Sequence, residues 1–254
     1  MDGSYANGFA PRDGLPLYPE LWQGCVGAWN PGLGPTGLTL RDWSGYGIHG
    51  TLTNMASDTA WVRNQGKTAL NFDGSNDSVI ASALTIGAVE GTISTWVRPD
   101  TWTGNATIFS MRTTDFLEAL HNGGTLLFRY GNGSAGTSLT LPTVGVWSHL
   151  AFVYNTASGL QYYINGNLSL STNPTWPAID VGGNLVIGNL DGSNLPFDGL
   201  ISDFRVYIRA ISTSEIRLLA SRPGIAYERT LRRRSSAAVA AFNRRRRLLV
   251  GAGV

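Results

Sequence analysis

The 254-residue chain has a single cysteine, little charge and no long apolar segment. Cys25 alone can form neither an internal disulfide nor a thiolate metal cluster. It lies in an apolar run with strand character, which predicts a buried, inert thiol rather than a catalytic nucleophile. No apolar run approaches the roughly 18 residues that span a bilayer, so we expect no membrane partner.

Residues 1–8 hold neither a basic region nor an apolar one, so we expect no secretory signal. Charged residues make up only 14% of the chain, and their signs are unevenly distributed. Residues 222–254 contain nine arginines and one acid, whereas the remainder contains ten basic and sixteen acidic residues. The sequence therefore predicts a mildly acidic body with a strongly basic tail.

Glycine, proline and tryptophan are plentiful, with 32, 11 and 8 residues. Many short strands, closely spaced turns and an aromatic core produce such a composition. A hydrophobic content of 43% and an aromatic content of 10% exclude disorder for the bulk of the chain. The Gly- and Pro-rich residues 1–24 predict an extended arm that lies on a surface.

Two local patterns predict specific elements. Asn165-Gly166 separates the strand-like residues 161–164 and 167–170, and this pair suits a type I′ turn, so we expect a tight hairpin. Ser212 and Glu215 fit a capping box, which predicts one short helix over about 213–221.

Six motifs follow one another between residues 25 and 221. They are Asp-x-Ser-Gly-x-Gly at 42–47, Phe-Asp-Gly at 72–74, Thr-Ile-Ser-x-Trp-Val at 92–97, Trp-x-His-Leu at 147–150, Tyr-Ile-Asn-Gly at 163–166, and the strand 197–207 with the following Ser-x-x-Glu-Ile. Together they resemble the laminin-G-like jelly-roll family of the concanavalin A-like superfamily.

The resemblance implies an all-β fold, an antiparallel β-sandwich jelly roll with one short C-terminal helix and extended terminal arms. We expect the sandwich domain at 25–221, the N-terminal arm at 1–24 and an Arg-rich C-terminal tail at 222–254.

Catalysis is not expected. Glycosidases on this fold carry a Glu-x-Asp-x-x-Glu strand, because retaining hydrolysis needs two carboxyl groups about 5 Å apart. No strand here has that pattern, and the three histidines lack a nucleophile motif nearby. His149 is predicted to be a hydrogen-bonded core residue. We therefore predict that the protein is not an enzyme.

Carbohydrate binding is common in the family that the chain resembles. It uses exposed aromatic rings that stack on sugars, with Asn or Asp side chains that bind hydroxyls. Trp102 with Asn105, and Trp176 between two prolines, are the candidates for a glycan site. The alternative is that each tryptophan closes an end of the core.

The resemblance also implies one structural Ca²⁺, with Asp42 and Asp203 at the matching acidic positions. Calcium prefers six to eight oxygen ligands. In the alternative interpretation, Asp42 closes an Asx turn and Asp203 pairs with Arg205 or Arg209. No other cofactor is predicted.

The tail has two arginine clusters, Arg232, Arg233 and Arg234, then Arg244, Arg245, Arg246 and Arg247. Clustered arginines bind phosphates or carboxylates. Because Phe242 is the only aromatic residue near the clusters, base stacking is not indicated. Docking on protein is therefore favoured over nucleic acid.

These features lead to a hypothesis. We predict a non-catalytic virion structural protein, such as a phage or viral capsid decoration or appendage protein. It would be made in the host cytoplasm, form a homo-oligomer or join a lattice, contact capsid proteins through its termini and present a lectin-like domain to host glycans. The alternative is a stand-alone, extracellular carbohydrate-binding lectin-like protein.

Overall fold

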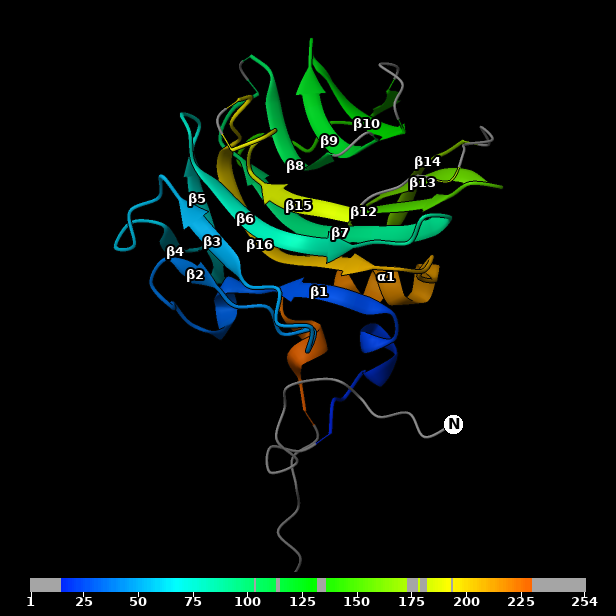
Figure 1. Ribbon diagram of the computed structural model, residues 1–254, viewed down its shortest axis with the longest axis horizontal. Coiled ribbons are helices and arrows are strands. Elements are labelled where there is room, and N and C mark those ends of the chain that lie inside the picture. The colour runs from blue at the N-terminus through cyan, green and yellow to red at the C-terminus, as the bar shows by residue number, and fades with distance from the viewer. Residues whose placement is uncertain are drawn as a thin grey trace, which may run out of the picture.

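The computed structural model describes residues 15–229, apart from residues 103, 113–114, 132–135, 173–177, 179–181 and 193. These residues form two antiparallel sheets packed face to face, with one short α-helix (Figure 1). The predicted all-β sandwich fold is confirmed.

The first sheet has the strand order β14-β13-β12-β7-β16-β5-β4, and β1 pairs with the second half of β16. Its strands are β1 (Cys25–Trp29), β4 (Trp61–Asn64), β5 (Lys67–Asp73), β7 (Glu90–Pro99), β12 (Ser148–Asn155), β13 (Gly159–Ile164), β14 (Asn167–Ser171) and β16 (Asp198–Tyr207).

The second sheet has the order β11-β10-β9-β8-β15-β6-β3-β2. Its strands are β2 (Thr39–Leu40), β3 (Gly50–Thr53), β6 (Ser78–Thr85), β8 (Ala106–Arg112), β9 (Phe116–Asn122), β10 (Thr125–Gly131), β11 (Thr137–Leu139) and β15 (Gly182–Ile187).

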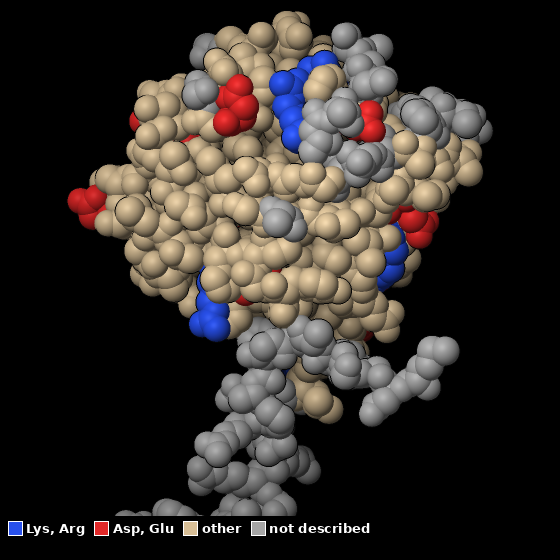
Figure 2. Space-filling view, in the orientation of Figure 1, with Lys and Arg blue, Asp and Glu red and all other residues tan. Residues whose placement is uncertain are grey.

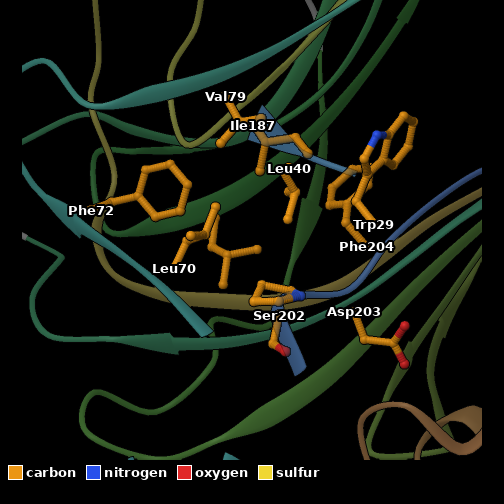
Figure 3. A pocket seen from close by; sticks show the side chains of 11 residues that line it. Trp29, Leu40, Leu70, Phe72, Val79, Ile187, Ser202, Asp203 and Phe204 are labelled. Carbon is orange, nitrogen blue, oxygen red and sulfur yellow. The ribbon is translucent and has the colours of Figure 1, made fainter. Parts of the chain in front are cut away.

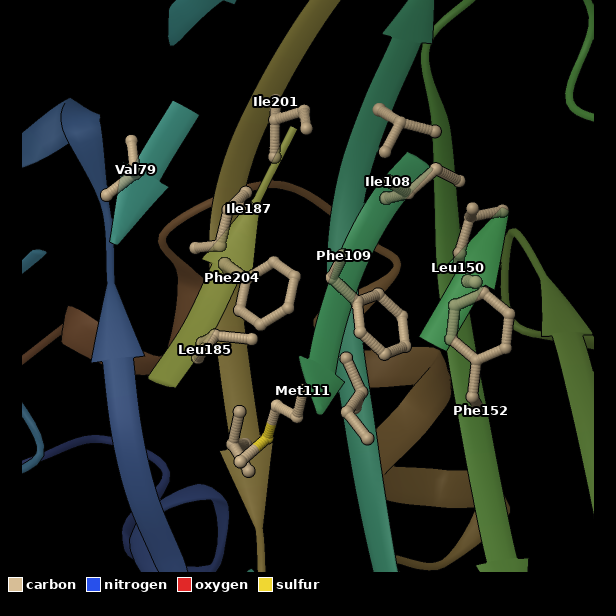
Figure 4. Close-up of a cluster of buried hydrophobic side chains, with 14 of the residues drawn as sticks. Val79, Ile108, Phe109, Met111, Leu150, Phe152, Leu185, Ile187, Ile201 and Phe204 are labelled. Atoms are coloured by element: carbon tan, nitrogen blue, oxygen red, sulfur yellow. The ribbon is translucent and has the colours of Figure 1, made fainter. Parts of the chain in front are cut away.

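The main core lies between the two sheets and is rich in aromatic side chains (Figure 4). Phe109 of β8 packs edge-on against Phe152 of β12 and Phe204 of β16, with ring centres 5.5 and 5.7 Å apart. Such edge-to-face pairs stabilise a core beyond the area that they bury. The two sheets are therefore held together by interlocking rings.

A second apolar cluster covers the outer face of the first sheet. It includes residues of the 3₁₀ turn η2 (Pro19–Trp22), the helix α1 (Thr213–Leu219) and the 3₁₀ turn η4 (Ile225–Tyr227). A further 3₁₀ turn, η3 (Pro31–Leu33), follows β1. The two sheets thus differ, since the first has its outer face covered by segments next to the two ends of the described chain.

Both local predictions are confirmed. Asn165 and Gly166 have φ values of 51° and 78°, the two positive values that a type I′ turn between β13 and β14 needs. The Ser212–Glu215 capping box is present, and α1 begins at Thr213. The helix ends at Leu219, two residues before the predicted end, because the chain turns there to bury Ile225 under the first sheet.

The described parts of the two predicted arms are folded. Leu21, in the predicted N-terminal arm, is fully buried, so residues 19–22 form a 3₁₀ turn where an extended chain was expected. The Leu17 N–H donates to Glu228 O at 2.8 Å, and Pro16 bridges to Arg229. The two ends of the described chain therefore leave the sandwich side by side.

None of the helices in the described ranges is long and apolar enough to cross a membrane.

Candidate functional site

The residues predicted to bind a glycan do not gather into one site. The Trp102 ring packs against His121 and Phe197, and its indole N–H donates to Pro142 O at 2.9 Å. This geometry fits the alternative role, a tryptophan that closes one end of the core. Asn105 is exposed just before β8, and Trp176 lies outside the described residues.

Asp42 is a buried turn-forming carboxylate, 5% exposed. Its two oxygens accept hydrogen bonds from the backbone N–H groups of Ala28, Ser44 and Ile48 at 2.9–3.0 Å, and from Ser44 Oγ at 2.8 Å. Four donors therefore already occupy the oxygens that a cation would need.

Asp203 is also buried and pairs with an arginine, as the alternative interpretation predicted. Its Oδ1 accepts from Arg205 Nε at 3.1 Å, and its Oδ2 accepts from the Gly224 N–H at 2.7 Å. The Arg205 guanidinium carbon lies 5.0 Å from the Trp22 ring centre and 4.6 Å from the Tyr227 ring centre, and the two rings also contact each other edge-on. This contact fastens η2 and η4 to the first sheet.

These two carboxylates do not fit a calcium ion. The donors around Asp42 are N–H and O–H groups, and the partner of Asp203 is itself a cation, whereas calcium needs converging oxygens. Within the described ranges, no three His, Cys, Asp or Glu side chains come together as ligands. The tail arginines 232–234 and 244–247 lie outside the described residues.

The cavity beside Asp203 is too small to bind a ligand. Apolar side chains such as Leu70, Phe72 and Ile187 line it, and the Asp203 carboxylate points away from it (Figure 3). Its volume is about 10 Å³, close to the minimum of roughly 10–15 Å³ that one water needs. We interpret it as a packing gap in the core.

Cys25 and His149 are both buried on the first sheet, as predicted. Burial raises the pKa of the Cys25 thiol to about 11, which keeps it protonated and unreactive at neutral pH. His149 Nε2 is 2.8 Å from Ser94 Oγ. Neither side chain is available to a ligand.

A charged cluster that the sequence analysis missed lies on the outer face of the second sheet. Leu117 and Ala119 of β9 point into the core, so Glu118 between them points outward. Its Oε1 accepts from Arg129 Nη1 at 2.7 Å, and its Oε2 accepts from Arg112 Nε at 2.8 Å. We call the surface formed by Ser110, Arg112, Phe116, Glu118 and Arg129 the Arg–Glu face.

The Arg–Glu face is preorganised by contacts among its own side chains. The guanidinium carbons of Arg112 and Arg129 lie 4.4 and 5.0 Å from the centre of the Phe116 ring, within cation–π range. Glu118 is fully buried beneath them, while the two arginines stay partly exposed. Figure 2 shows basic side chains at the surface over β8–β10. The face therefore presents fixed hydrogen-bond donors beside an aromatic ring.

Polar groups continue along the same side of the sheet. Thr107 is buried, and its Oγ1 has no hydrogen-bond partner in the described structure; the same is true of Arg129 Nε. Asn105 lies two residues before Thr107, which favours the same side of the strand. Asn122, at the end of β9, is exposed. Buried donors without partners cost free energy, so these two atoms make this part of the sheet less stable.

One signal in the sequence could have revealed this cluster. Gly123-Gly124 is a two-residue turn between strand-like segments, and counting outward from it pairs Glu118 with Arg129. Opposite charges facing each other across a hairpin stabilise the pairing. The third member, Arg112, could not be found in this way, because the sequence Thr-Thr-Asp at 113–115 lacks the glycine or asparagine that marks a tight hairpin turn.

Comparisons with known proteins agree with this architecture. A family model described as the concanavalin A-like lectin/glucanases superfamily matches residues 73–217. Domain 4 of AbnA, an extracellular GH43 arabinanase from Geobacillus stearothermophilus solved with arabinotriose, is 22% identical, with a TM-score of 0.63 over 77% of this chain and 98% of that one. No curated protein sequence matches.

Two toxin domains have a similar fold. The binding domain of Paraclostridial Mosquitocidal Protein 1 is 17% identical, with a TM-score of 0.64 over 79% of this chain. The binding domain of botulinum neurotoxin serotype D is 15% identical, with a TM-score of 0.61 over 80% of this chain. The chain spans about half of each toxin domain, 52% in both cases. At these identities the likeness concerns the fold alone.

Proposed function

The chain belongs to the concanavalin A-like lectin/glucanases superfamily, and from that premise we propose that it is a non-catalytic carbohydrate-binding protein whose ligand binds on the Arg–Glu face. The observation that carries this proposal is the cluster of Arg112, Arg129 and Phe116 around the buried Glu118. Sugar sites combine a ring for stacking with a few fixed polar groups.

A binding role agrees better with this geometry than hydrolysis does. A retaining or inverting glycosidase needs two carboxyl groups across the scissile bond. Within β8, β9 and β10, Glu118 is the single acidic residue, and both its oxygens accept hydrogen bonds from arginines. Within these three strands the second carboxyl group that hydrolysis needs is therefore missing, which supports the proposed binding role.

A glycan array with the full chain tests the proposal. We expect the wild-type protein to bind a defined set of glycans, and Arg112→Ala and Asn105→Ala to weaken that binding about tenfold, the loss that corresponds to one good hydrogen bond. Arg63→Ala, an exposed arginine on β4 of the first sheet, is the matched control and keeps wild-type binding. Equal binding by all four proteins would contradict the proposal.

A specific observation favours display of this domain on a virion. Both ends of the described chain leave from one place, at Pro16 and Arg229, on the side of the first sheet. The Arg–Glu face lies on the outer side of the other sheet, and Figure 1 shows the ends and β8–β10 on opposite sides of the molecule. A domain anchored by its ends would thus turn the Arg–Glu face outward.

We further propose that the protein is a phage or viral capsid decoration or appendage component, fastened through its termini. A polar groove of about 480 Å³ next to those ends, lined by Asn30, Lys67 and Arg222, supports docking on that side. The arginine clusters at 232–234 and 244–247 would bind carboxylates of a neighbouring capsid protein or of another copy.

Truncation at Thr230 tests this role. Residues 225–226 are buried in the fold, so the deletion must begin after Arg229 to leave the sandwich intact. We expect deletion of residues 230–254 to abolish incorporation into particles without changing the thermal unfolding temperature. Incorporation of the truncated chain at the wild-type level would contradict anchoring through the tail. Absence of the wild-type chain from purified particles would contradict the virion role and leave carbohydrate binding as the function.

A further inference from the structure

A second pocket lies in the loop that joins β2 to β3, at residues 41–49. It has a volume of about 140 Å³, far above the roughly 10–15 Å³ that one water needs. Its lining residues are Arg41, Asp42, Trp43, Gly45, Gly47 and His49. In the second sheet, β15, β6 and β3 separate β8 from β2, so the pocket is distinct from the Arg–Glu face.

The loop is held rigidly by the Asp42 carboxylate, whose four donors come from both ends of the loop and from β1. The backbone N–H of Trp43 also donates to Ala28 O at 2.8 Å. Gly45 and Gly47 have φ values of 98° and 73°, which favour glycine, and because glycine has no side chain the backbone at both positions is uncovered. Ligand binding to a site that is already ordered costs less conformational entropy.

The side chains around the pocket are of the kinds that recognise ligands. The Arg41 guanidinium carbon lies 4.7 Å from the Trp43 ring centre, so the two groups fix each other. The Asp42 N–H donates to His49 Nδ1 at 3.1 Å, so the exposed ring presents its Nε2 N–H as a donor. Tyr46 is 60% exposed between the two glycines.

We propose that this pocket binds a single neutral sugar ring. The Trp43 ring can contact the apolar face of a pyranose, and Arg41 and His49 can donate to its hydroxyls. Arg41 and Asp42 carry opposite charges, so the pocket has no net attraction for an anion. The choice of a sugar rather than another polar ring rests on the proposed carbohydrate-binding function.

Titration of the ¹⁵N-labelled full chain with methyl glycosides of glucose, galactose, mannose and N-acetylglucosamine tests this site. We expect at least one of them to shift the Trp43 indole N–H signal saturably. Arg41→Ala and His49→Ala, both at exposed positions that line the pocket, should raise the dissociation constant about tenfold. Arg63→Ala and Leu168→Ala, at exposed positions on the first sheet, are the matched controls and should not change it.

The same experiment separates the two sites. If no glycoside shifts the Trp43 signal, or if Arg41→Ala and His49→Ala bind like wild type, the second site is refuted, whatever the glycan array shows. If Arg112→Ala leaves both the array signal and the Trp43 titration intact, the Arg–Glu face is refuted and the loop pocket stands.

Discussion

His149 illustrates how a buried side chain ties stability to pH. Its ring is enclosed by Trp96 and Ser94, and Arg205 acts on it electrostatically from the same side of the sheet. Burial, with a smaller contribution from Arg205, lowers the pKa of His149 to about 3. Because its unfolded pKa is near 6.5, the unfolded chain takes up the proton first as the pH falls.

We therefore expect the free energy of unfolding to decrease between about pH 6.5 and pH 3, with His149 contributing up to about 1.4 kcal/mol per pH unit. Above pH 6.5 this contribution is constant. His149→Gln should flatten the dependence, measured by urea denaturation at pH 7, 6, 5 and 4. His49→Gln, at an exposed position, should keep the wild-type slope. Identical slopes for all three proteins would show that His149 is not the group responsible.

Arg205 and Asp203 form a fully buried ion pair, with side chains 0% and 2% exposed. Arg205→Met would leave the carboxylate buried without its partner, which typically costs about 3–5 kcal/mol. Asp203 has a φ of 46°, a value that asparagine tolerates, so Asp203→Asn removes the charge without straining the backbone.

In a double-mutant cycle followed by urea denaturation, we expect the combined variant to lose clearly less stability than the sum of the two single variants. Additivity within about 0.5 kcal/mol would mean that the pair is not coupled. The Asp203 variant should also respond to calcium or a chelator no differently from wild type, since the geometry of this carboxylate does not fit calcium.

At the scale of elements, the short helix α1 depends on its N-terminal cap. Ser212 Oγ accepts from the Glu215 N–H at 3.3 Å, and Glu215 Oε2 accepts from the Ser212 N–H at 2.8 Å. Ser212→Ala should destabilise the protein by about 1 kcal/mol, read from thermal or urea unfolding. Ser214→Ala removes a hydroxyl that contacts Ser212 Oγ but leaves both backbone hydrogen bonds of the cap in place, so it should cost much less. An equal loss in both variants would contradict the role of the cap.

The elements that could be predicted from the sequence are those determined by residues close together in the chain. The β13–β14 turn follows from Asn165-Gly166 alone, and the start of α1 follows from Ser212 and Glu215. The end of α1 does not, because it depends on burial of Ile225 beneath a sheet assembled from distant strands.

The same difference between local and long-range contacts explains which parts of the candidate site could be predicted from the sequence. Trp102 is turned into the core by a hydrogen bond to Pro142, 40 residues away, and Asp42 is saturated partly by Ala28 of another strand. The spacing of these residues in the sequence predicts neither of these two contacts. The pairing of Glu118 with Arg129 is local enough to be read from a hairpin, but Arg112 joins them only once β8 pairs with β9.

At the scale of the whole molecule, the two outer faces of the sandwich have different roles in our account. The face of the first sheet is covered by η2, α1 and η4, next to both ends of the described chain. The face of the second sheet carries partly exposed arginines over a buried carboxylate. We thus assign anchoring to the side of the first sheet and ligand binding to the outer face of the second sheet.

The most direct test is a crystal structure of the full chain with the glycan that binds best on the array. We predict sugar hydroxyls within hydrogen-bonding distance of the Arg112 or Arg129 guanidinium, on the outer face of β8–β10. A glycan bound instead on the first sheet, with the Arg–Glu face holding none, would contradict the account.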